Sequence, residues 1–102
     1  MATLHIEHAV TDLDTWTRAY ARFAEVRRGA GVRSERVRRP ADDPTFVVID
    51  LDFETTDQAA AFLGFLRTQV WARPEASPAL AGRPEARILV PVALEPAPVA
   101  AP

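Results

Sequence analysis

The sequence predicts an α+β domain in which a four-stranded antiparallel sheet carries two helices on one face. Each half of the chain begins with alternating apolar and polar residues, at 3–10 and at 45–53, as in a half-buried strand. Each then continues with apolar residues three and four apart, which is typical of one helical face. Between the halves, residues 39–44 are rich in Pro and Asp, which favour turns.

The first half reads as strand, helix, strand. In residues 3–10 one face carries the side chains that we expect to point at the helices: Leu4, Ile6, His8 and Val10. Thr11 or Asp12 is expected to cap the first helix. Its apolar positions are Leu13, Trp16, Ala19, Tyr20 and Phe23. Gly29 and Gly31 supply a left-handed stop, and a weaker strand is expected over residues 32–38.

The second half repeats this order. In residues 45–53, the strongest strand, one face carries Val47, Ile49, Leu51 and Phe53. Thr55 to Gln58 has the spacing of a capping box. The helix that follows is expected to bury Ala59, Phe62, Leu63, Leu66 and Val70. Residues 71–84 are Pro-rich and irregular, with a short helical turn expected at 75–80, and a last strand is expected over 86–94.

Two strand–helix–strand units of about fifty residues each indicate the split βαβ, ferredoxin-like fold. Right-handed crossovers place both helices on one face of the sheet. We expect a single domain over residues 1–94 and a frayed Ala- and Pro-rich tail over 95–102. The other sheet face carries Phe46 and Val48, so it is expected to be apolar enough to need a second copy as cover, in a C2 homodimer.

Composition excludes several kinds of chemistry. The 102 residues contain no Cys, and all twelve basic residues are Arg. Thiolate catalysis, disulfides and Schiff-base lysines are therefore excluded. A net charge of −2 gives no electrostatic footprint for nucleic acid. Without a signal-like or membrane-spanning stretch, we expect a cytoplasmic protein with no membrane partner.

The candidate site lies where the first strand meets the first helix. His8 is predicted to face the helices, where a neutral imidazole can act as a general base or can simply be a buried, satisfied histidine. Tyr20 is a candidate hydrogen-bond partner for it, since a buried hydroxyl needs one. We expect these two to line an apolar cavity together with Trp16, Phe62, Leu66 and Trp71, suited to a flat hydrophobic molecule.

Other charged residues favour structural interpretations. Asp50 and Asp52 share the helix-free face, where pairing across a dimer interface with Arg33 or Arg87 is expected over catalysis. His5, Glu7 and Asp50 offer metal-ligand types without a supporting spacing, so we expect neither a metal nor a cofactor. Three arginines beside the turn are expected to form a solvated hairpin edge: Arg36, Arg38 and Arg39.

Several short patterns resemble a known group of proteins. They are His8-x-Val10-x-Asp12-x-Asp14-x-Trp16, Arg27 with Gly29, Gly31 and Val32, Asp42-Asp43-Pro44, Leu51-Asp52-Phe53 with Ala59-x-x-Phe62, Ala81-Gly82-x-Pro84-Glu85, and Leu89-x-Pro91-Val92. In this order they resemble small actinobacterial members of the dimeric α/β-barrel superfamily, beside the antibiotic biosynthesis monooxygenases and polyketide cyclases. The resemblance covers roughly residues 4–94. It implies a homodimer whose sheets face each other, with a pocket between sheet and helices in each subunit.

Three functions follow as hypotheses. The first is a cofactor-independent enzyme of cyclase, isomerase or monooxygenase type that acts on a hydrophobic aromatic or polyketide-like substrate. In it His8 would abstract a proton, while Tyr20 or an arginine would hold the developing oxyanion. The second is a non-catalytic ligand-binding or stress-associated dimer that uses the same pocket. The third is a plain dimerisation module, which a pocket too small for a six-membered ring would favour.

Overall fold

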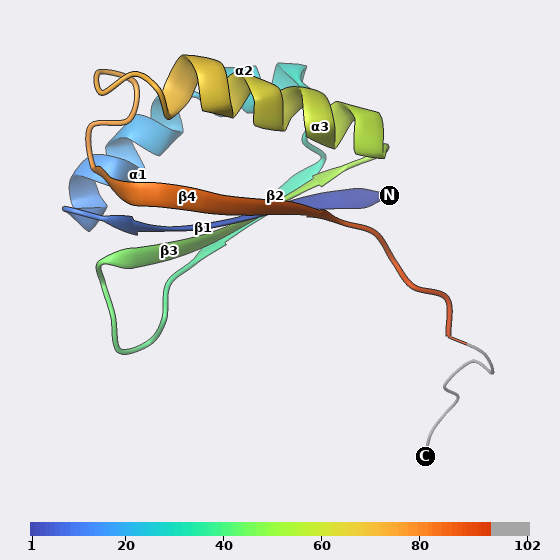
Figure 1. Ribbon diagram of the computed structural model, residues 1–102, viewed down its shortest axis with the longest axis horizontal. Coiled ribbons are helices and arrows are strands. Elements are labelled where there is room, and N and C mark those ends of the chain that lie inside the picture. The colour runs from blue at the N-terminus through green and yellow to red at the C-terminus, as the bar shows by residue number, and fades with distance from the viewer. Residues whose placement is uncertain (95–102) are drawn as a thin grey trace.

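The computed structural model describes residues 1–94 and has the predicted α+β architecture, with helices on one face of a single sheet (Figure 1). The elements are, in chain order, β1 (Ala2–Val10), α1 (Leu13–Arg22), α2 (Ala24–Gly29), β2 (Ser34–Arg38), β3 (Phe46–Phe53), α3 (Thr56–Phe65), the π-helical turn η1 (Leu66–Val70) and β4 (Leu80–Leu89). In this part of the chain no helix is both long and apolar enough to cross a membrane.

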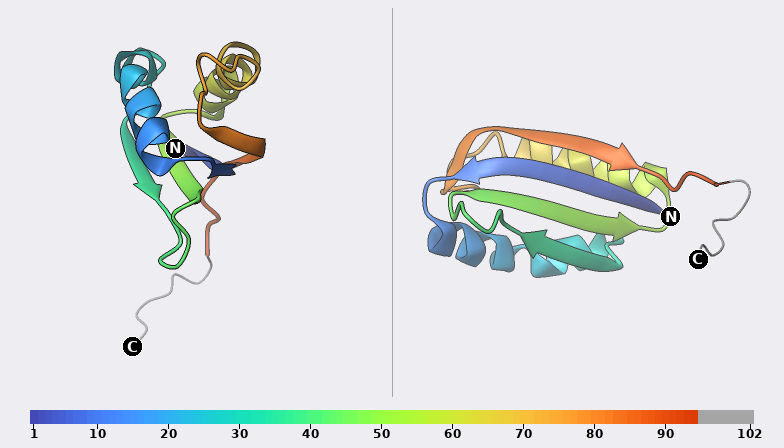
Figure 2. Two further views of the ribbon diagram at one scale, coloured as in Figure 1. Left: turned by 90° about the vertical axis from the view of Figure 1, so that its left-hand side faces the viewer. Right: turned by 90° about the horizontal axis from the view of Figure 1, so that it is seen from below.

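The sheet has the strand order β2-β3-β1-β4, and every neighbouring pair is antiparallel. This order confirms the ferredoxin-like prediction. Viewed along the sheet, α1 and α2 lie over its β2 side and α3 lies over its β4 side, while no helix of residues 1–94 covers the opposite face (Figure 2). The two central strands pair over most of their length, with Ile6 opposite Ile49 and His5 opposite Asp50.

The core forms where the helix-facing side chains of β1 and β3 meet α3. Exposure along β1 alternates residue by residue between buried and half-buried, as the pleat of a one-sided sheet requires. Leu4, Ile6, Leu51 and Phe53 are at most 2% exposed. Phe53 packs against Phe62 of α3, with ring centroids 5.9 Å apart.

Both predicted helix caps are present. The Asp12 carboxylate accepts a hydrogen bond from the Thr15 backbone N–H at 2.9 Å, and Thr55 and Gln58 form a complete capping box. The first helical segment is interrupted at Phe23, after which α2 continues to Gly29. Gly31 makes the left-handed stop with φ +104°, and a Cβ there would lie 2.9 Å from the Gln58 amide nitrogen.

The predicted second helix, which is α3 with η1, ends differently from the prediction, because its last turn is π-helical. The Trp71 N–H donates to the Leu66 carbonyl at 2.7 Å, which is an i to i+5 bond. The wider turn keeps Leu66, Val70 and Trp71 all directed at the same cavity.

The predicted position of the last strand is wrong: β4 runs over Leu80–Leu89 and not over 86–94. Its alternation is hidden by a bulge, since the register passes from Glu7↔Glu85 to Ala9↔Ala81 and leaves three β4 residues opposite His8. Gly82, with φ +74°, lies in this bulge. Turns occupy the place of the short helix expected at 75–80, and the tail expected at 95–102 lies outside the described residues.

Candidate functional site

A cavity lies between the sheet and the helices, at the carboxyl end of β1. The space between its lining atoms, counted out to the open mouth, is about 610 Å³, and the enclosed part is much smaller. All six residues expected at a cavity from the sequence line it: His8, Trp16, Tyr20, Phe62, Leu66 and Trp71. The lining also includes Arg27 and Ser77 but no carboxylate, so it offers a proton acceptor and a cation in place of a metal-ligand set.

Aromatic rings line the cavity in two groups, one at α1 and one at α3. Trp16 meets the His8 ring edge-on with centroids 5.9 Å apart, and it stacks on Tyr20 at 4.9 Å and 22°. On the α3 side, Phe62 stacks on Phe65 at 5.7 Å. Flat, weakly polar surfaces of this kind favour a planar ligand.

His8 has one ring nitrogen fixed and the other free. The ring belongs to a residue that is only 4% exposed, and Nδ1 donates to the Ala9 carbonyl at 2.9 Å. A carbonyl can only accept, so Nδ1 carries the proton, and neutral His8 then presents Nε2 as an acceptor. Nε2 makes no hydrogen bond among the described residues. Burial lowers the pKa of His8 below 6.5, which keeps the ring neutral near pH 7.

Tyr20 does not form the expected hydrogen-bonded pair with His8, because the Trp16 ring lies between them. Its hydroxyl instead donates to the Glu35 carboxylate of β2. Burial and this bond raise the pKa of Tyr20 well above 10, so the phenol stays protonated. Within the cavity Tyr20 therefore presents its ring, while its proton is committed elsewhere.

Arg27 is the cavity residue that the sequence reasoning missed as a site residue. Its side chain is 7% exposed and its guanidinium carbon lies 3.6 Å above the centre of the Tyr20 ring. The available signal was the spacing: Trp16, Tyr20, Phe23 and Arg27 continue one helical stripe, so a cation stands where an apolar residue is expected. A charge at such a position is buried by the fold and needs partners.

Residues 71–80 supply part of the cavity wall. Trp71, Ala76, Ser77 and Leu80 line it, and the Ser77 hydroxyl is within hydrogen-bond distance of the Val70 and Arg73 carbonyls, at 2.9 and 3.1 Å. These contacts anchor the irregular segment to the end of η1. Trp71 thus lies at the cavity wall, where the sequence analysis placed it.

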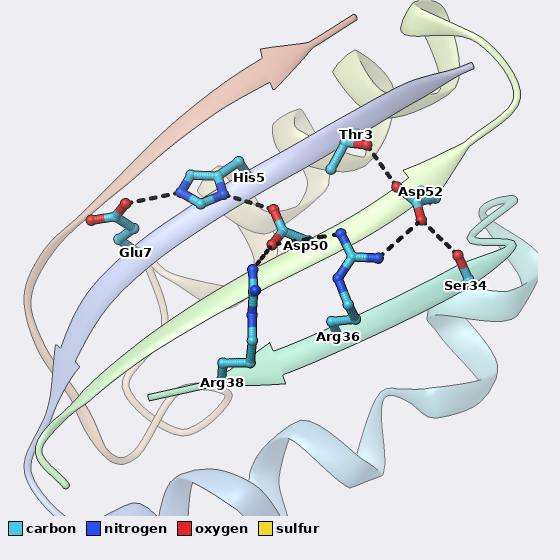
Figure 3. A network of polar contacts seen from close by, with 8 residues as sticks. All are labelled: Thr3, His5, Glu7, Ser34, Arg36, Arg38, Asp50 and Asp52. Atoms are coloured by element: carbon cyan, nitrogen blue, oxygen red, sulfur yellow. Dashed lines mark hydrogen bonds and ion pairs between the residues drawn. The ribbon is translucent and has the colours of Figure 1, made fainter. Parts of the chain in front are cut away.

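The helix-free face carries a network of polar contacts within one chain (Figure 3). His5 lies between Glu7 and Asp50, with nitrogen–oxygen distances of 2.9 and 2.7 Å, and Arg38 bonds Asp50 at 2.6 Å. Arg36 lies within 3.9 Å of Asp50 and 3.8 Å of Asp52. Within the chain, Arg36 and Arg38 are the partners of these aspartates, because they lie next to them on β2. Pairing with Arg33 or Arg87 across a dimer interface stays a prediction.

This network also corrects the expected character of the face. Residues opposite one another in the register share a face, and most of those here are polar: Thr3, His5, Glu7, Ser34, Arg36, Arg38, Asp50, Asp52, Glu85 and Arg87. Phe46 and Val48 are only half-exposed. Asp50 is 4% exposed because its neighbours cover it. Within residues 1–94, no group of three or more acidic or His side chains is arranged to hold a metal ion.

Comparison with known proteins places this geometry in a fold. No protein-family model matches the chain, and no curated protein sequence does so significantly. Solved structures match over nearly their whole length. SnoaB, a cofactor-independent oxygenase from Streptomyces nogalater, is 20% identical with a TM-score of 0.68, over 93% of this chain and 96% of its own.

Two further structures agree. A Nitrosomonas europaea protein assigned as an antibiotic biosynthesis monooxygenase is 20% identical with a TM-score of 0.67, over 91% of this chain and all of its own. A dimeric ferredoxin-like protein from an uncultured marine organism is 11% identical with a TM-score of 0.59, over 90% and 96%. This chain has their fold. The resemblance to monooxygenase-like ferredoxin-fold proteins that the sequence indicated is confirmed at that level.

The pKa values of the two histidines are expected to depart from the ordinary value of 6.5 in opposite directions. The bonds to Glu7 and Asp50 raise the pKa of His5, with Arg36, Arg38 and Arg87 nearby on the same face, whereas burial lowers that of His8. Ring-proton NMR between pH 4 and 9 measures both pKa values. The variants His5→Gln and His8→Gln assign the signals, since each removes one of them.

The stability consequences follow by linkage. Because its folded pKa is raised, His5 stabilises the fold fully below pH 6.5, and this contribution is lost as pH rises through the folded pKa. His8 has a lowered folded pKa, so its neutral form stabilises above pH 6.5 and loses that effect as pH falls. A pKa of His8 above that of His5 would contradict the burial of the His8 ring and the bonds of His5 to its two carboxylates.

Proposed function

We propose that this protein is a small cofactor-independent enzyme that abstracts a proton from a planar hydrophobic substrate, with His8 as the base. One observation carries the proposal: a buried imidazole, fixed through Nδ1 by the Ala9 carbonyl, lines an apolar aromatic cavity, and its Nε2 bonds to no group of residues 1–94. A fixed tautomer and a free lone pair are what a general base requires. The fold shared with a cofactor-independent oxygenase supports the same class.

The reaction begins at a weakly acidic C–H of the substrate. Nε2 of His8 takes the proton, and the electron pair of the broken C–H bond stays on the substrate as a carbanion or enolate. Trp16, Tyr20 and Phe62 hold the ring system, and Leu66 and Trp71 keep water away from it. Tyr20 acts here through its stacked ring, because its hydroxyl already donates to Glu35.

The same carbanion leads to each of the three reaction types that the sequence left open. Reprotonation at another atom gives an isomer, and attack on a carbonyl of the same molecule gives a ring. Electron transfer to dioxygen, which then adds to the carbon, gives an oxygenated product. A substrate with aromatic or polyketide-like carbon framework fits all three, since its C–H groups next to carbonyls are acidic.

Exchange of a ketone C–H for deuterium tests the base directly. With 2-tetralone in D₂O, followed by NMR, the wild type is expected to accelerate exchange next to the carbonyl. His8→Ala is expected to lower this acceleration by roughly 10²-fold or more, the usual contribution of a general base. His5→Ala is the matched control, because that ring lies on the opposite sheet face, and it should retain the exchange rate.

Circular dichroism is the control for folding, because the two exchange rates can be compared only if His8→Ala is folded. Equal exchange rates in the wild type and His8→Ala would contradict the role of His8. Loss of the fold in His8→Ala would show that the ring is a structural core histidine.

The second candidate is a non-catalytic ligand-binding or stress-associated dimer with the same cavity. The observation that favours it is the burial of His8, which lowers its pKa and so weakens it as a base. Binding of 2-tetralone without any accelerated exchange would select this function over the first.

For the assembly, we propose a homodimer through the helix-free sheet face. The support is the open sheet face itself and the fold shared with a protein described as dimeric. Because the face is largely polar, its ion pairs would meet the partner's across the interface, and Phe46 and Val48 would form its apolar centre.

Light scattering on the purified protein checks the dimer. We expect a mass of two chains at micromolar concentration, from an interface of at least about 1,000 Å². Val48→Glu should give the mass of one chain, because it buries an unpaired charge at the interface. Val37→Glu, on the helix side of β2, should leave two chains. A wild type with the mass of one chain would overturn the assembly.

A further inference from the structure

The polar end of the cavity contains a cation that the proton-abstraction proposal does not use. Arg27 reaches it from α2, and its side chain is more than nine-tenths buried. One terminal nitrogen, Nη1, donates to the Tyr20 carbonyl at 2.6 Å. Nε lies 2.9 Å from Glu35 Oε1 but is a buried donor without a well-directed hydrogen bond, and Nη2 makes none among the described residues. A buried guanidinium with spare donors is suited to binding an anionic oxygen.

Glu35 holds this cation from outside the cavity. The carboxylate sits on β2, is 41% exposed and does not line the cavity, yet it accepts from the Tyr20 hydroxyl and faces Arg27 Nε. It therefore neutralises Arg27 from the solvent side and leaves the inner side without a counter-charge. Apart from Arg27, the cavity is lined by the neutral imidazole of His8, by Ser77 and by largely apolar walls. In surroundings of such low polarity the interaction of a charge with its partner is strengthened.

We propose that Arg27 is the specificity-determining residue of the cavity: it selects planar ligands that carry an anionic oxygen, and Glu35 sets the strength of that selection as a built-in counter-ion. Trp16 and Tyr20 separate Arg27 from His8, so the ligand's oxyanion lies at one end of the stacked wall and the reacting carbon at the other. This inference rests on the cavity being the ligand site of the proposed function.

The test uses two probes of the same shape, the anion 2-naphthoate and neutral 2-naphthamide, measured by calorimetric titration. The wild type is expected to bind naphthoate roughly ten- to a hundredfold more tightly, as a charge-assisted bond in a dry site provides. Arg27→Gln should bring the two affinities together. Arg28→Gln is the matched control, since Arg28 is 66% exposed and pairs with Glu25.

Glu35→Gln gives the more discriminating result, because it removes a charge while an amide oxygen can still accept from Tyr20. It is expected to tighten naphthoate binding roughly three- to tenfold and to leave naphthamide unchanged, since a half-exposed carboxylate is partly screened. Glu25→Gln, in the exposed pair, should change neither. The Glu35→Gln variant keeps the test decisive even if Arg27→Gln fails to fold.

The outcomes separate this inference from the function on which it rests. Equal affinities of the wild type for both probes, or an unchanged naphthoate affinity in Glu35→Gln, would overturn the role of Arg27 while leaving the cavity a ligand site. Failure of both probes to bind at millimolar concentration would overturn it together with the ligand site itself.

Discussion

The pleat of β1 determines which of its side chains enter the core and which join the open sheet face. Successive side chains of this strand point to opposite faces, so Leu4, Ile6 and His8 enter the helix-covered core while His5 and Glu7 join the open face. A shift by one residue would exchange these sets. One strand thereby separates two imidazoles into two environments: an apolar cavity that keeps His8 neutral, and a pair of carboxylates that favours protonated His5.

Irregular backbone lies beside His8 on two sides. A bulge in β4 places three residues opposite His8, and the π turn η1 turns Trp71 toward the same space. Such irregularities weaken regular hydrogen bonding, and they recur next to functional sites. With α1 on one side and α3 on the other, the cavity is lined from both helices and from the sheet between them.

The fold could be predicted because its signals are local and agree with one another. Alternation over residues 3–10 and 45–53, the Asp12 cap and the Thr55 capping box each specify an element without reference to the others. The last strand could not be placed, since Gly82 and Pro84 in its bulge break the alternation from which a strand is recognised. The π turn was missed for a related reason: its apolar spacing is compatible with an α-helix.

The site shows the same division between local and non-local information. Residues on known faces of β1, α1 and α3 could be assigned to a common cavity, because the βαβ topology determines what meets there. The partners of polar groups could not be predicted. Tyr20 and Glu35 are 15 positions apart, and Asp50 and Arg38 are 12 apart. Their pairing depends on how far side chains reach from α1 to β2 and from β3 to β2. Of these two pairs, only Asp50 with Arg38 lies on the open face, where it adds to the polar character of that face.

If a planar ligand binds and reacts in the cavity beside His8, a crystal structure of the complex with 2-tetralone will show it there. We expect the ring between Trp16 and Phe62, with the carbon next to the ketone facing Nε2 of His8. A ligand ordered on the open sheet face, or a cavity filled only by water at saturating ligand, would contradict it.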